Sequence, residues 1–265
     1  MKKELISATI VQPVHQPIRH KAAYDKENGR MYREKTGEKM EKKISVLGVW
    51  ADRCTAKDAM RICVEYSHTD ALNIVEILTA DVLVQSRMTE GVKENIAEAD
   101  LVLIGDKAIL EAAGITDRQM LKETEGNVFL KMFLRFLKKD GQRLFLVGDS
   151  QEDLAEFQSF LETHHQGLRI VGSAVIPEHD KGDDMIVNQI NGLEVDCILS
   201  GLSVAKQEAF IKRNRNLLNA RLWMRIGKTP RTSGESSGFA GTVRNFLRKH
   251  ILIKEMEKEN RKKEN

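Results

Sequence analysis

The chain has few of the features that mark membrane, secreted or metal-binding proteins. Its 265 residues include only three cysteines, Cys54, Cys63 and Cys197, and their odd number and wide spacing favour reduced thiols. No stretch approaches the roughly 18 apolar residues that span a bilayer, and no apolar block follows the first residues as in a signal peptide. We therefore expect a cytoplasmic protein.

Several ligand-binding motifs are also missing. The sequence contains neither a Gly-x-x-x-x-Gly-Lys-Ser/Thr loop nor a Gly-x-Gly-x-x-Gly fingerprint, so kinase-like and dinucleotide-dependent enzymes lose support. It has no Asp-x-Asp pair that could carry a divalent cation, and we expect no metal and no cofactor.

Positive and negative charges nearly balance over the whole chain, but an excess of positive charge is concentrated at its two ends. The net charge is +3, yet residues 1–43 carry eleven Lys and Arg against six acidic residues, and the chain from Arg244 onward carries eight against four. Such ends could be solvated tails or could meet an anionic membrane surface. Few aromatic side chains lie among these charges to stack on bases, so we expect no nucleic-acid partner.

Short apolar runs alternate with helical patterns through the middle of the chain. Strands are predicted at 44–49, 71–78, 99–104, 143–147, 168–171, 195–199 and 220–224. Helices are predicted between them, including one that Thr55 and Asp58 begin as a near capping box and one that runs to about Ala97. This alternation predicts an α/β fold, a Rossmann-like, mostly parallel sheet with helices on both faces.

The composition divides the chain into three parts. Residues 1–42 are polar and show no sustained periodicity, which predicts a flexible basic leader. Residues 43–226 form the α/β domain. Residues 227–265 begin as a loop rich in Gly, Ser and Thr and end in a basic amphipathic helix, which either packs on its own domain or attaches to anionic lipid.

The most informative stretch is 193–223, which predicts strand, loop, helix and strand. Gly201 follows the strand, and the polar triplet Lys206, Gln207 and Glu208 opens the helix. In an open α/β sheet, ligands lie outside the carboxyl ends of the strands, so Gly201 and these polar residues are candidate site residues. Gln207 can donate and accept, which suits a sugar or uracil edge, whereas Glu208 could instead cap the helix or pair with Lys212.

This stretch resembles a known family. Gly201-Leu-Ser-x-x-Lys-Gln-Glu, followed by Leu-Asn-Ala-Arg-Leu-Trp up to Trp223, is similar to the signature of the WecG/TagA/CpsF glycosyltransferases. Ala205 stands where that family usually has Pro, and the runs 143–148, 167–172 and 44–49 stand where it has earlier strands.

The resemblance implies both substrates. The donor would be a UDP-N-acetylhexosamine, in the family UDP-N-acetylmannosamine, and the acceptor an undecaprenyl-diphosphate-linked sugar in cell-surface polysaccharide or teichoic-acid synthesis. The protein would then work at the cytoplasmic face of the plasma membrane as a peripheral protein, and a homo-oligomer is a further expectation.

The resemblance also implies site residues, several of which depart from the family pattern. Thr79 matches the Thr of a Thr-x-Asn-Pro motif, but Asp81 replaces its amide with a carboxylate, which cannot donate to a sugar or phosphate. Asp106 stands near the family's proposed general base, and it could equally be a structural turn residue.

The family's glycine-rich segment has become basic. Arg225, Lys228 and Arg231 are new cations there, which could hold diphosphate or belong to a solvated loop. Arg244 and Arg248, further along, would also hold diphosphate. These departures keep open an alternative function, a catalytically inactive relative that serves as a binding or regulatory module.

Overall fold

A computed structural model describes residues 23–25, 30–32, 43–89 and 91–226. Its central feature is a six-stranded sheet in the order β6-β5-β10-β9-β7-β8, in which every pairing is parallel. The strands are β5 (Asn73–Leu78), β6 (Leu101–Ile104), β7 (Arg143–Gly148), β8 (Arg169–Val175), β9 (Cys197–Ser200) and β10 (Leu222–Arg225). The predicted α/β class is confirmed.

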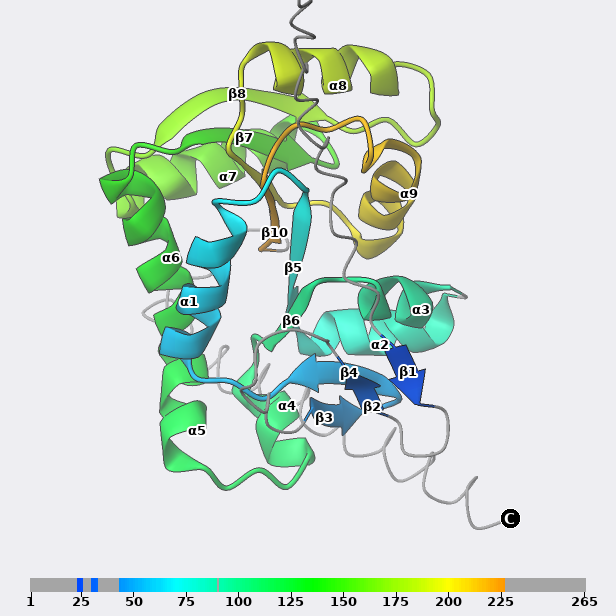
Figure 1. The fold of residues 1–265 in the computed structure, drawn as a ribbon, viewed down its shortest axis with the longest axis vertical. Coiled ribbons are helices and arrows are strands. Elements are labelled where there is room, and N and C mark those ends of the chain that lie inside the picture. The colour runs from blue at the N-terminus through cyan, green and yellow to red at the C-terminus, as the bar shows by residue number, and fades with distance from the viewer. Residues whose placement is uncertain (1–22, 26–29, 33–42, 90, 227–265) are drawn as a thin grey trace, which may run out of the picture. The chain divides into compact units, whose positions relative to one another are not determined.

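Helices cover both faces of this sheet (Figure 1). On one face, α1 (Ala56–Tyr66), α6 (Val128–Lys139) and α7 (Gln151–His164) share a core with alternate strand residues such as Val75 and Leu144. The side chains that alternate with these along each strand point to the other face of the sheet. All four residues of both β9 and β10 are buried, as expected for strands covered on two sides.

The other face carries two smaller cores. One contains Trp223, Phe145 and residues of α8 (Asp183–Gly192) and α9 (Val204–Asn214). The second contains Leu78, Val102 and residues of the short helices α2 (Ala80–Met88), α3 (Val92–Ala97), α4 (Lys107–Ala112) and α5 (Arg118–Glu125). A polar cluster that includes Glu76, described below, lies on this same face of the sheet.

The start of α1 follows the predicted capping box. The side chain of Thr55 accepts a hydrogen bond from Asp58 N at 3.2 Å, and Thr55 N donates to Asp58 Oδ2 at 3.4 Å. Both bonds satisfy backbone N–H groups that have no partner inside the helix. The chain therefore enters α1 where the sequence predicts.

Two predicted elements are wrong in detail. The run 44–49 is not one strand but a tight antiparallel hairpin of β3 (Lys43–Val46) and β4 (Val49–Asp52), because Leu47 and Gly48 both adopt positive φ and reverse the chain. The helix predicted to run to Ala97 is two helices, since Gly91 has φ 84°.

The chain divides into two compact units, Met1–Met40 and Glu41–Asn265. In the first, β1 (Ala23–Asp25) pairs with β2 (Arg30–Tyr32) in antiparallel register, so part of the predicted leader forms a strand pair. The predicted flexibility of residues 1–42 stays a prediction, and the carboxyl-terminal loop and helix at 227–265 lie outside the described residues. Within the described ranges, none of the helices has the length and apolar character needed to cross a bilayer.

Candidate functional site at the carboxyl ends of the strands

The loops after β5 and β6 bring two predicted site residues together. Thr79 precedes α2, and its side chain accepts from Val82 N at 3.4 Å. Asp106 precedes α4, and its Oδ2 accepts from Ala80 N at 2.7 Å. The carboxylate of Asp106 therefore lies against the backbone that follows Thr79, and both side chains are half-buried.

Gly105 allows these two loops to approach each other. A Cβ at this position would lie 2.5 Å from Ile77 Cγ2, closer than two carbon atoms can pack, and Gly105 N donates to Leu78 O at 2.8 Å. A glycine is thus required beside Asp106 for steric reasons.

Asp81 lies two residues beyond Thr79 in the chain. It is exposed in the first turn of α2, where a carboxylate interacts favourably with the partial positive charge of a helix amino end. This placement gives Asp81 a local structural role, and its predicted contact with substrate stays a prediction.

The loops after β7 and β9 are tied together by Asp149. Its Oδ2 accepts from Ser203 N at 3.0 Å and its Oδ1 from Ser203 Oγ at 3.1 Å. Lys206 Nζ donates to Asp149 O at 3.2 Å and lies 3.9 Å from Asp149 Oδ1. Gly201 N donates to Val147 O at 2.9 Å. Two predicted residues, Lys206 and Gly201, therefore join neighbouring loops at the same sheet edge as Asp106.

Gln207 points into the protein instead of toward solvent. Its side chain is 0 % exposed, and its Oε1 accepts from Ser200 Oγ at 2.9 Å and from Trp223 Nε1 at 3.0 Å. Its Nε2 donates to Glu76 Oε2 at 3.0 Å. In this structure the side-chain amide expected to meet a sugar or uracil is bonded to protein groups instead, which favours an internal role for Gln207.

Glu76 and Arg225 form a buried ion pair beside Gln207. They lie on the adjacent strands β5 and β10, directly opposite each other, and are only 2 % and 4 % exposed. Arg225 Nη1 donates to Glu76 Oε1 in a short hydrogen bond. The sequence motifs point to Arg225 but not to Glu76, whose only local signal is a carboxylate inside the apolar run Asn-Ile-Val-Glu-Ile-Leu.

Burial dominates the electrostatics of the two carboxyl groups here. It raises the pKa of Glu76, and the opposing effects of Arg225 and Gln207 lower it. Burial also raises the pKa of Glu208 to about 7, and the charge of Glu76 adds to this increase. A carboxyl group that changes charge near neutral pH thus lies beside a buried ion pair.

We expect Glu208 to make stability depend on pH. Its native pKa exceeds the unfolded value, so the native state binds more protons between about pH 4.5 and 7, and the free energy of unfolding falls as pH rises through 7. Because the side chain of Glu208 is half-buried, we expect the free energy of unfolding to fall by roughly 1 to 2 kcal/mol, which is less than the full pKa shift would imply. Urea unfolding at pH 5 and pH 8 measures this loss.

Glu208→Gln should remove that component of the pH dependence. Glu156→Gln, at an exposed position on α7, should leave it unchanged. If Glu208→Gln keeps the pH dependence of the wild-type protein, the pKa of the Glu208 carboxyl group is not raised by folding.

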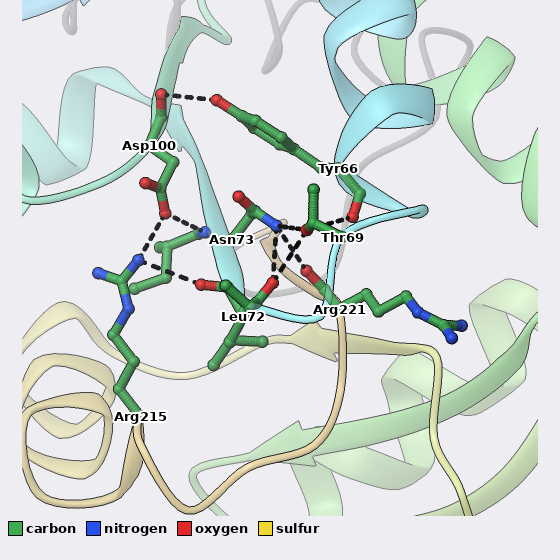
Figure 2. Close-up of polar contacts among 9 residues, drawn as sticks. Tyr66, Thr69, Leu72, Asn73, Asp100, Arg215 and Arg221 are labelled. Atoms are coloured by element: carbon green, nitrogen blue, oxygen red, sulfur yellow. Dashed lines mark hydrogen bonds and ion pairs between the residues drawn. The ribbon is translucent and has the colours of Figure 1, made fainter. Parts of the chain in front are cut away.

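The opposite edge of the sheet carries a second polar cluster, at the amino ends of β5 and β6 (Figure 2). Asp100 Oδ2 accepts from Ile74 N at 2.8 Å and from Arg215 Nη2 at 2.7 Å, and Tyr66 donates its hydroxyl to Asp100 O at 3.2 Å. Asn73 Nδ2 donates to Thr69 Oγ1 at 2.6 Å. These bonds satisfy backbone groups where the strands begin, which is a structural role.

Three predicted diphosphate-binding residues, Arg231, Arg244 and Arg248, lie outside the described residues. Among the residues that the structure describes, no group of three or more His, Cys, Asp or Glu side chains is arranged to hold a metal ion.

Comparison with known proteins identifies the family. Residues 44–235 match the glycosyl transferase WecG/TagA/CpsF family, which is more than half of the chain. No curated protein gave a significant match. The chain therefore belongs to the WecG/TagA/CpsF family of glycosyltransferases, enzymes of cell-surface polysaccharide synthesis.

Proposed function

We propose that the protein transfers an N-acetylhexosamine, such as N-acetylmannosamine, from a UDP-sugar to a sugar linked to undecaprenyl diphosphate. The observation that carries the proposal is the position of Asp106, whose carboxylate lies at the carboxyl edge of the sheet against Ala80 N, one residue after Thr79. Membership of the glycosyltransferase family supports the reaction type.

In this proposal Asp106 is the general base. It takes the proton from the acceptor hydroxyl as that oxygen attacks C1 of the donor sugar, and the bond from C1 to the UDP oxygen breaks with inversion. The hydrogen bond from Ala80 N fixes the orientation of the carboxylate, and Thr79 helps to orient the sugar.

The diphosphate needs donors and cations. Helices α2, α7 and α9 all begin at this edge, and backbone N–H groups at helix amino ends bind phosphate well. Lys206 and the basic residues Arg231, Arg244 and Arg248 are the cations we propose for this function. The basic carboxyl-terminal segment would also bring the protein to the anionic cytoplasmic membrane surface where the lipid-linked acceptor resides. A homo-oligomer remains part of the proposal.

A second candidate function is a relative without catalytic activity that binds or regulates. It is favoured by the internal contacts of Gln207 and by the pairing of Lys206 with Asp149, which leave fewer groups directed at a substrate.

Two measurements separate these candidates. Calorimetric titration with UDP, UDP-N-acetylglucosamine and UDP-N-acetylmannosamine reports donor binding and sugar preference. UDP release in the presence of a short-chain lipid-diphosphate-linked N-acetylglucosamine reports transfer. We expect micromolar to millimolar UDP-sugar binding and acceptor-dependent UDP release. Binding without release would support the inactive relative, and no binding at all would contradict the proposed function.

A further inference from the structure

Arg225 combines burial with an unused donor. It is the last residue of β10, an inner strand between β5 and β9, and therefore lies at the carboxyl edge of the sheet. Its Nη1 is bonded to Glu76, whereas its Nε is buried and has no hydrogen-bond partner among the described residues. A buried N–H without a partner costs free energy, so a group that accepts from it would be bound favourably.

Glu76 holds Arg225 and the start of α9 at the same time. One carboxylate oxygen accepts from Arg225 Nη1 and the other from Gln207 Nε2. Gln207 N donates to Ser203 O at 3.0 Å, and Ser203 binds Asp149. A single side chain on β5 thus fixes the cation at the end of β10 and the loop that follows β9.

The charges of this cluster suit an anion. The Glu76–Arg225 pair is neutral overall, which makes its burial tolerable, while Arg225 Nε keeps a buried N–H that no described residue accepts. A planar guanidinium held from one side can bind phosphate oxygens with its other N–H groups. Helices α2, α7 and α9 begin at the same edge of the sheet, and the partial positive charge of a helix amino end also favours an anion.

We propose that Arg225 binds the diphosphate of the sugar nucleotide and that Glu76 is its positioning residue. This inference rests on the proposed function, because the ligand is the UDP portion of the donor. Glu76 acts through Arg225 and Gln207 and need not touch the substrate.

The test compares UDP with uridine, which lacks the phosphates. In the wild-type protein, UDP should bind more tightly than uridine. Glu76→Asp keeps the charge but withdraws the carboxylate by one methylene, so Arg225 loses its fixed position. We expect UDP affinity to fall about 10- to 100-fold while uridine affinity stays unchanged. Arg225→Lys keeps the charge but removes Nε, and it should give the same pattern.

Asp100→Asn provides the matched control. It weakens the ion pair between Asp100 and Arg215, which is similar in length to the Glu76–Arg225 pair but lies at the opposite edge of the sheet (Figure 2). This variant should leave both affinities unchanged. Equal loss of UDP and uridine affinity in Glu76→Asp and Arg225→Lys would indicate general damage and overturn the inference. Unchanged UDP affinity in both Glu76→Asp and Arg225→Lys would also overturn the inference, but it would not contradict the proposed function. Failure of the wild-type protein to bind UDP would instead contradict the proposed function.

Discussion

Replacing Arg225 with alanine should lower the free energy of unfolding by about 3 to 5 kcal/mol, because it leaves the Glu76 carboxylate buried without its counter-charge. Urea unfolding at pH 7 measures the loss. The deficit should shrink as pH falls, since burial raises the pKa of Glu76 and the variant can take up a proton there.

The double variant Glu76→Gln with Arg225→Met separates charge from packing. It removes both charges, and the new amide can still accept from Gln207 Nε2, so we expect it to recover most of the lost stability. A double variant as unstable as Arg225→Ala would show that shape, and not an unpaired charge, causes the loss.

Asp106→Asn should reduce the rate of sugar transfer by about 100- to 10,000-fold, because an amide cannot take up the acceptor proton. The amide oxygen can still accept from Ala80 N, so stability and UDP affinity should remain near those of the wild-type protein. Acceptor-dependent UDP release measures the rate, and calorimetry measures the affinity.

Asp117→Asn is the control for this prediction. Asp117, like Asp106, occupies the N-cap position of a short helix, where it accepts from Gln119 N at 2.9 Å and Met120 N at 3.3 Å, but it precedes α5 and does not follow a strand of the sheet. Its variant should keep full activity. A fully active Asp106→Asn enzyme would exclude Asp106 as the base.

The sheet could be predicted from the sequence because parallel strands buried on both faces are recognisable as short apolar runs. The hairpin at 43–52 could not, since its apolar residues continue across the turn and only Leu47 and Gly48 reverse the chain. Local patterns predict which residues form strands better than they predict where the chain turns between them.

The site was harder to predict for a different reason. Lys206 and Gln207 are neighbours in one polar triplet, but on a helix adjacent residues face different directions, and only Gln207 points into the core. Glu76 bonds to residues 131 and 149 positions away, and no local pattern reveals such partners. Asp106 could be located because the family that the sequence resembles has its proposed general base just after this strand, and Asp106 lies two residues beyond Ile104.

Hydrogen exchange with and without UDP tests most directly whether the strand carboxyl ends bind a sugar nucleotide. We predict slower exchange at the backbone amides of residues 79–82, 105–107, 149–151 and 203–207 when UDP is bound, and no change around Asp100 and Arg215 at the opposite edge. Protection confined to that opposite edge, or no protection at all at saturating UDP, would contradict the proposed site.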